Sequence, residues 1–121
     1  MKVSIHRISR YAVQVLTRKM GENAHTFITV RLYDDDDALR GTAVFENLGG
    51  SEPSKPTGDF SAQTATVHMD IALYDPYMKL LKHERTVYLK MNWTEQGRTK
   101  TLTHTSIDTK KEIIGEYFTQ Q

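Results

Sequence analysis

The chain has 121 residues, a length that suits one domain built around a single hydrophobic core. Hydrophobic residues make up 38% and charged residues 26%, and the formal net charge is +1, so the composition is that of a soluble globular protein without a bulk attraction to nucleic acid or anionic lipid. The absence of cysteine excludes disulfide bonds, thiolate metal sites and cysteine nucleophiles.

The sequence contains no run that approaches the roughly 18 apolar residues of a transmembrane helix. Residues 1–7 also lack the apolar core and the small-residue cleavage site of a secretory signal. We therefore expect a cytoplasmic protein without a membrane partner, and we do not expect nucleic acid to be a partner.

The residue types favour a sheet, because 15 Thr, 7 Val and 7 Ile are β-branched and fit a pleated surface. At the N-terminus, apolar and polar residues alternate on odd positions such as Val3, Ile5 and Val13, whereas Ile8 falls on the other parity. One extra residue exchanges the two faces of a strand, so we predict a bulge near Ser9–Arg10. A turn is expected at residues 20–23.

Residues 26–33 and 41–47 show the same alternation and predict two strands joined by a hairpin at residues 34–40. Residues 49–59 contain three Gly and two Pro and no large apolar side chain. This composition predicts a flexible loop. We place that loop inside a single domain that spans residues 1–121.

Alternation from Ala65 to Leu73 predicts a strand over residues 64–74. Asp75 followed by Pro76 is a good helix start, and the sequence predicts a short helix over residues 75–83. Further strands are expected at residues 87–93 and 98–107, joined by a turn at Gly97. Residues 109–118 fit either a helix capped by Asp108 or a final edge strand.

These elements predict an all-β fold with one or two short helices. The short turns between strands favour an antiparallel β-sandwich or a meander barrel of about six to seven strands.

The most conspicuous polar feature is the acidic run Asp34, Asp35, Asp36 and Asp37. An EF-hand loop that began at Asp34 would need Gly at its sixth position and Glu at its twelfth, but the chain has Leu39 and Phe45 there. We therefore interpret the run as a solvated hairpin tip that contacts a partner, because binding residues concentrate on loops held by a rigid scaffold.

His68, Asp70 and His104 are the candidate metal ligands. Two histidines and one carboxylate can hold Fe(II) or zinc, and His68 and Asp70 point the same way on one strand. Against this, His104 shares the parity of Leu102, so a buried Leu102 would place the two imidazoles on different sides of the sheet. An exposed His68 and a partly buried His104 are the alternative interpretation.

No nucleophile elbow, Walker loop or dinucleotide fingerprint is present in the sequence. We therefore predict no enzyme activity and no cofactor.

The charges are segregated, because residues 1–20 hold five Lys or Arg and no acid, whereas residues 21–37 hold five acids and one Arg. Opposite patches favour pairing with another protein or with further copies of the chain. The expected function is thus protein–protein interaction or self-assembly, as an inhibitor, adaptor or assembly unit. The alternatives are a small-molecule-binding β-barrel and a metalloenzyme that uses His68, Asp70 and His104.

Overall fold

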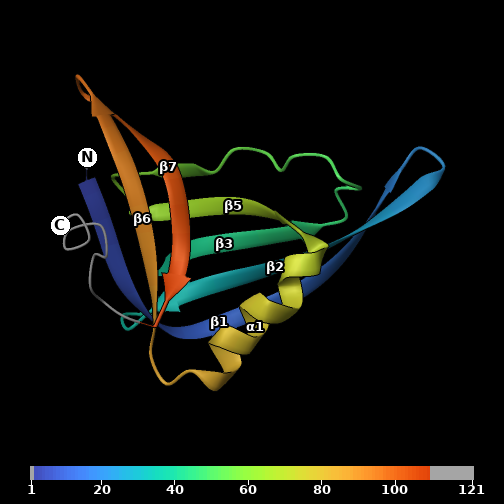
Figure 1. Cartoon of the computed structure of the whole chain (residues 1–121), viewed down its shortest axis with the longest axis horizontal. Helices are drawn as coiled ribbons and strands as arrows, with labels where there is room; N and C mark the ends of the chain where they lie inside the picture. The colour runs from blue at the N-terminus through green and yellow to red at the C-terminus, as the bar shows by residue number, and fades with distance from the viewer. Residues whose placement is uncertain (1, 110–121) are drawn as a thin grey trace.

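The computed structural model describes residues 2–109, which form seven strands, a short 3₁₀ helix and one α-helix (Figure 1). In chain order these are β1 (Lys2–Met20), β2 (Asn23–Asp34), β3 (Leu39–Glu46), β4 (Thr57–Asp59), β5 (Thr64–Asp70), η1 (Ile71–Leu73), α1 (Tyr74–His83), β6 (Val87–Gln96) and β7 (Thr99–Asp108). The 109–118 segment lies outside the described residues except for its first residue, so helix and strand both stay open there.

The strands form one sheet in the order β4-β5-β3-β2-β1-β6-β7, and this sheet is nearly closed into a barrel. The all-β prediction and its barrel alternative are therefore confirmed. The expectation that the sheet is antiparallel throughout is wrong, because β3 and β5 run parallel. Parallel neighbours need a crossover of about a dozen residues or more, and residues 47–63 provide one. Within it, residues 57–59 of the predicted loop form the edge strand β4.

The interior follows the predicted alternation. Val87, Leu89, Met91 and Trp93 of β6 are all buried, and so is Leu102 of β7. The largest fully buried side chains come from three central strands: Trp93, Phe45, Leu32, Met91 and Val30. Burying side chains of this size is the main favourable contribution to folding, at roughly 1.5–3 kcal/mol each.

Side chains close the barrel where β4 and β7 approach without a shared ladder. The rings of Phe60 and Trp93 meet edge to face, with centroids 5.2 Å apart. The Lys100 ammonium lies 4.7 Å from the centre of the Phe60 ring. Gly58 is required here, because a Cβ at this position would lie 2.9 Å from both the Trp93 ring and the Thr64 carbonyl oxygen.

The segment after β5 differs from the prediction. β5 ends at Asp70, whose carboxylate accepts the Ala72 N–H at 2.9 Å and so caps η1. The strand predicted to continue to residue 74 therefore stops four residues early. Helix α1 follows from Tyr74, and Leu73 rather than Asp75 occupies the position before it.

Helix α1 covers the inner face of the sheet. Its Tyr74 and Tyr77 rings meet Phe45 of β3 edge to face, at centroid distances of 5.4 and 5.2 Å. Met78 and Leu81 are buried. None of the helices in residues 2–109 has the length and apolar character that crossing a bilayer requires.

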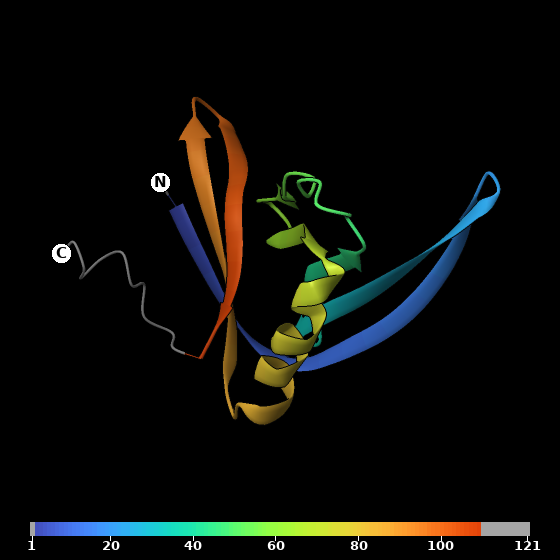
Figure 2. The same ribbon diagram turned by 45° about the vertical axis from the view of Figure 1, so that its right-hand side comes forward.

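Strand β1 pairs with two different strands along its length. Lys2 to Ile8 pair with β6, and the strand then pairs with β2 as far as Met20. The register shifts between Ile8 and Arg10, which confirms the predicted bulge. Beyond Phe27, where the β2–β3 ladder ends, β1 and β2 project from the barrel as a long hairpin (Figures 1 and 2). We call residues 12–28, which comprise this hairpin and the part of the sheet that leads into it, the hairpin arm; its turn contains Gly21 at a φ of 66°.

Candidate functional site

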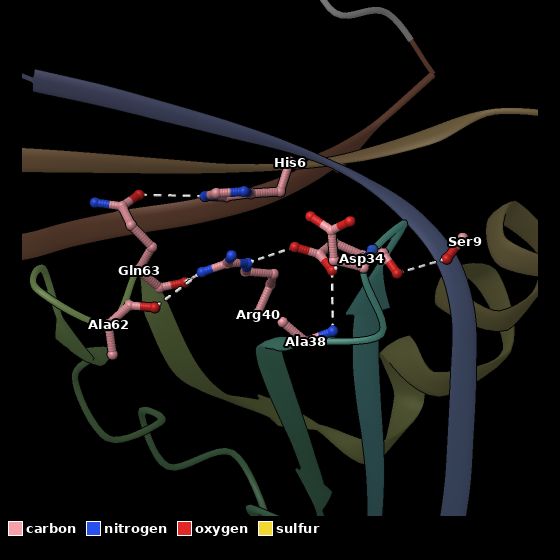
Figure 3. Close-up of polar contacts among 8 residues, drawn as sticks. His6, Ser9, Asp34, Ala38, Arg40, Ala62 and Gln63 are labelled. Carbon is pink, nitrogen blue, oxygen red and sulfur yellow. Dashed lines mark hydrogen bonds and ion pairs between the residues drawn. The ribbon is translucent and has the colours of Figure 1, made fainter.

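The acidic run begins with a buried carboxylate, because Asp34 is only 8% exposed. One of its oxygens accepts the N–H groups of Asp36 and Ala38, both at 2.9 Å, and the other accepts Arg40 Nε at 2.8 Å (Figure 3). Arg40 and these backbone donors lower the pKa of Asp34. The carboxylate therefore holds the β2–β3 turn together.

A polar network extends from this turn to two other parts of the fold (Figure 3). Ser9 Oγ donates to the Asp34 carbonyl at 2.7 Å, and Arg40 donates to the Ala62 carbonyl at 2.9 Å. Gln63, which has a φ of 55°, places its Oε1 3.2 Å from His6 Nε2. The network thus joins β1, the β2–β3 turn and the β4–β5 turn.

Two further acids of the run pair with arginines of the basic N-terminal strand. Arg7 lies 3.1 Å from Asp35, and Arg10 lies 2.7 Å from Asp37. Asp36 has no ion-pair partner among residues 2–109. Much of the charge segregation seen in the sequence is therefore neutralised within one molecule. Partner binding by Asp34 to Asp37 stays a prediction.

We expect Asp34→Asn to lower the melting temperature at neutral pH and to flatten its fall in acid. Because the folded-state pKa of Asp34 is lowered, its stabilisation is present above the unfolded-state pKa of about 3.9 and is lost as the pH falls through the folded-state value. Thermal melts of the wild type and the variant between neutral and strongly acidic pH measure this difference. Asp36→Asn is the matched control, and equal melting temperatures of Asp34→Asn and the wild type at neutral pH would contradict the assignment.

The three candidate metal ligands are not brought together. Within residues 2–109, no three His, Cys, Asp or Glu side chains lie close enough to hold a metal ion. Asp70 instead accepts the N–H groups of Leu48 and Ala72. His104 is exposed although Leu102 is buried, because the β6–β7 register shifts at Thr103. The expectation that His104 shares the buried face of Leu102 is therefore wrong, because the bulge turns His104 to the other face. The expectation of an exposed His68 is also wrong, since His68 is half-buried.

Small-molecule binding by the barrel stays a prediction. A cavity of about 180 Å³ lies where β5, β7 and α1 meet, lined in part by Met69, Tyr77 and Ile107. Pockets for small ligands usually measure roughly 300–1,000 Å³. This cavity is smaller than the pocket that a ligand-binding barrel would need.

A larger hollow lies at the base of the hairpin arm. It has a volume of about 650 Å³ and combines apolar side chains with Arg18 and Lys19. The Thr29 side chain also lines it, and its buried hydroxyl has no hydrogen-bond partner within the described part of the chain. The full lining is Leu16, Thr17, Arg18, Lys19, Phe27, Thr29, Val44, Glu46, Ser54 and His68.

The outer edge of β1 is the feature that sequence reasoning missed. Residues 10–20 pair with β2 on one side, and within residues 2–109 no strand pairs with their other side. Val13, Val15 and Leu16 on this segment are 41%, 63% and 40% exposed. The sequence carries one signal of this, since residues 11–17 form an uncharged run of strand-forming residues without Gly or Pro.

The chain matches no known family model, no curated protein and no solved structure. The geometry of its own residues is therefore the basis for a functional assignment.

Proposed function

We propose that this protein is a non-catalytic β module that binds another protein, or further copies of itself, through the hairpin arm. The observation that supports this is the unpaired edge of β1 residues 10–20 with exposed apolar side chains. Natural sheets protect such edges with charge, proline or a covering element, because an open edge pairs readily with another chain. A two-stranded hairpin is also marginally stable alone in water, so a bound partner would stabilise the arm.

The polar groups favour binding over catalysis. Arginines of the same chain form ion pairs with Asp34, Asp35 and Asp37. The Asp70 carboxylate accepts hydrogen bonds from backbone N–H groups. These contacts give the carboxylates structural roles. The hollow beside the arm adds a recess for an inserted apolar side chain. A cytoplasmic setting, expected from the sequence, forms part of this proposal.

We expect Val15→Lys to reduce partner binding about tenfold or more. Burial of one apolar side chain of this size contributes roughly 1.5–3 kcal/mol, and 1.4 kcal/mol is a factor of ten in affinity. The tagged full-length chain, immobilised with each variant in turn, is exposed to an extract of its native source, and the retained proteins, including copies of the chain itself, are identified and quantified by mass spectrometry.

Leu73→Lys is the matched control, because Leu73 is 50% exposed and lies outside the arm. A protein retained by the wild type and by Leu73→Lys, but not by Val15→Lys, supports the proposal. Retention that is the same for all three chains refutes it.

A further inference from the structure

We propose that the hollow at the base of the hairpin arm also binds a free small molecule that carries an ammonium group, a carboxylate and an apolar body, as an apolar amino acid does. This inference goes beyond the proposed function, which concerns the edge of β1. Three observations on residues 2–109 support it. The hollow has the size of a ligand site, it combines an apolar floor with two opposite charges that form no ion pair, and it contains a buried hydroxyl without a hydrogen-bond partner.

The hollow lies on the outer face of the sheet, opposite the core. Phe27 and Thr29 of β2 alternate with Ile28 and Val30, which pack in the core, so the side chains of Phe27 and Thr29 point outward. Residues that pair directly across a ladder share a face, and this places beside them the side chains of Leu16, Val44, Glu46 and His68. The volume of about 650 Å³ lies within the range of roughly 300–1,000 Å³ that is usual for ligand pockets.

Two opposite charges in the hollow have no ion-pair partner among residues 2–109: Arg18 and Glu46. The Arg18 guanidinium lies 5.8 Å from the centre of the Phe27 ring, and Glu46 pairs with Phe27 from the other side. Two strand spacings and two residues separate the Cα atoms of Arg18 and Glu46, a distance of roughly 12 Å. A carboxylate on Arg18 and an ammonium group on Glu46 can therefore belong to one small molecule.

The floor between these charges is apolar, because Leu16, Phe27 and Val44 line it. An apolar ligand body that covers these side chains removes their surface and its own from water, which favours binding. Thr29 pairs with Val44 and is only 8% exposed, and its hydroxyl has no hydrogen-bond partner within the described part of the chain. A buried hydroxyl without a partner is unfavourable. A ligand carboxylate that accepts from Thr29 as well as from Arg18 removes this penalty.

The two charges together favour a zwitterion over a ligand with a single charge. An anion without an ammonium group brings a like charge near Glu46 and leaves that carboxylate unpaired. An amine without a carboxylate does the same to Arg18. Charge complementarity of this kind contributes specificity more than affinity. The hollow should therefore discriminate between molecules that share an apolar body and differ in charge.

Titration of the isotope-labelled full chain, followed by amide NMR shifts, measures this binding and locates it. The zwitterionic probes are L-phenylalanine, with its charges close together, and aminooctanoate, with its charges at the two ends. Each is compared with the carboxylate and the amine that keep its apolar part: phenylpropanoate and phenethylamine, octanoate and octylamine. We expect at least one zwitterion to bind about tenfold or more tightly than both of its relatives, and to shift amides of residues 16–18, 27–29 and 44–46. Binding of neither zwitterion at these residues overturns the inference.

Charge-neutral variants test which group of the ligand meets which residue. Arg18→Gln should weaken the zwitterion and the carboxylate about fivefold or more and spare the amine. Glu46→Gln should weaken the zwitterion and the amine by a similar factor and spare the carboxylate. Arg98→Gln and Glu84→Gln are the matched controls, because both residues are exposed and lie outside the hollow. Affinities that are the same in the wild type and in all four variants overturn the assignment.

The inference and the proposed function fail separately. Val15 pairs with Ile28 on the inner face of the arm and does not line the hollow, so Val15→Lys should lose the protein partner and keep the zwitterion. If no zwitterion binds while protein capture still depends on Val15, only this inference is overturned. If a zwitterion binds as expected and capture does not depend on Val15, only the proposed function is overturned.

Discussion

Replacement of Trp93 with alanine should lower the free energy of unfolding by about 3–5 kcal/mol, the usual range for removing a large buried aromatic side chain. Trp93 is fully buried in β6, and its ring meets Phe60 edge to face at 5.2 Å. Its Nε1 donates to Ser4 Oγ at 3.1 Å. The substitution thus removes core packing and the contact that joins the two edges of the barrel.

Denaturant titration followed by far-ultraviolet circular dichroism measures this change for both proteins, because Trp93 is the only tryptophan and its fluorescence is lost in the variant. Thr101→Ala is the control, since Thr101 is exposed on the neighbouring strand β7. A change below about 1 kcal/mol for Trp93→Ala would contradict the closure of the barrel at this residue.

Local patterns predicted the strands because burial of one face imposes a period of two on the sequence. The alternation from Val87 to Trp93 and the parity change at Ile8 both depend only on neighbours along the chain, and both predictions are confirmed. The end of β5 was misplaced because Ile71 and Leu73 continue the alternation, whereas Asp70 caps a 3₁₀ helix there. The cap formed by Asp70 therefore starts the 3₁₀ helix although the apolar alternation continues to Leu73.

The alternation of apolar and polar residues could not predict contacts between segments that lie far apart in the sequence. Nothing near Gly58 indicates that its missing side chain admits the Trp93 ring, because the two positions meet only when the barrel closes. The parallel pairing of β3 and β5 has the same origin.

For the candidate site, the sequence showed the charges of Arg7, Arg10 and the acidic run, but it did not show that they pair within one molecule. The free edge of β1 required the strand order, which periodicity does not specify.

Replacement of Phe45 with alanine should also lower the free energy of unfolding by about 3–5 kcal/mol. Here the loss comes from contacts with helix α1 rather than from the Phe60–Trp93 contact that closes the barrel. Phe45 is fully buried in β3, and Tyr74 and Tyr77 of α1 both meet its ring. Its loss leaves α1 without its aromatic contact, so amide hydrogen exchange over residues 74–83 should accelerate more than exchange in β6. Phe45→Leu, which retains most of the volume, should cost less than about 1.5 kcal/mol.

This variant separates folding from the proposed binding of a partner. Phe45 lies on β3, two strands away from the free edge of β1, and its side chain points into the core. At a temperature where Phe45→Ala remains folded, it should therefore retain the same partner as the wild type, whereas Val15→Lys should keep the wild-type unfolding free energy to within about 0.5 kcal/mol. If Phe45→Ala lost the partner as readily as Val15→Lys while still folded, the proposed partner would contact the helix-covered face rather than the edge of β1.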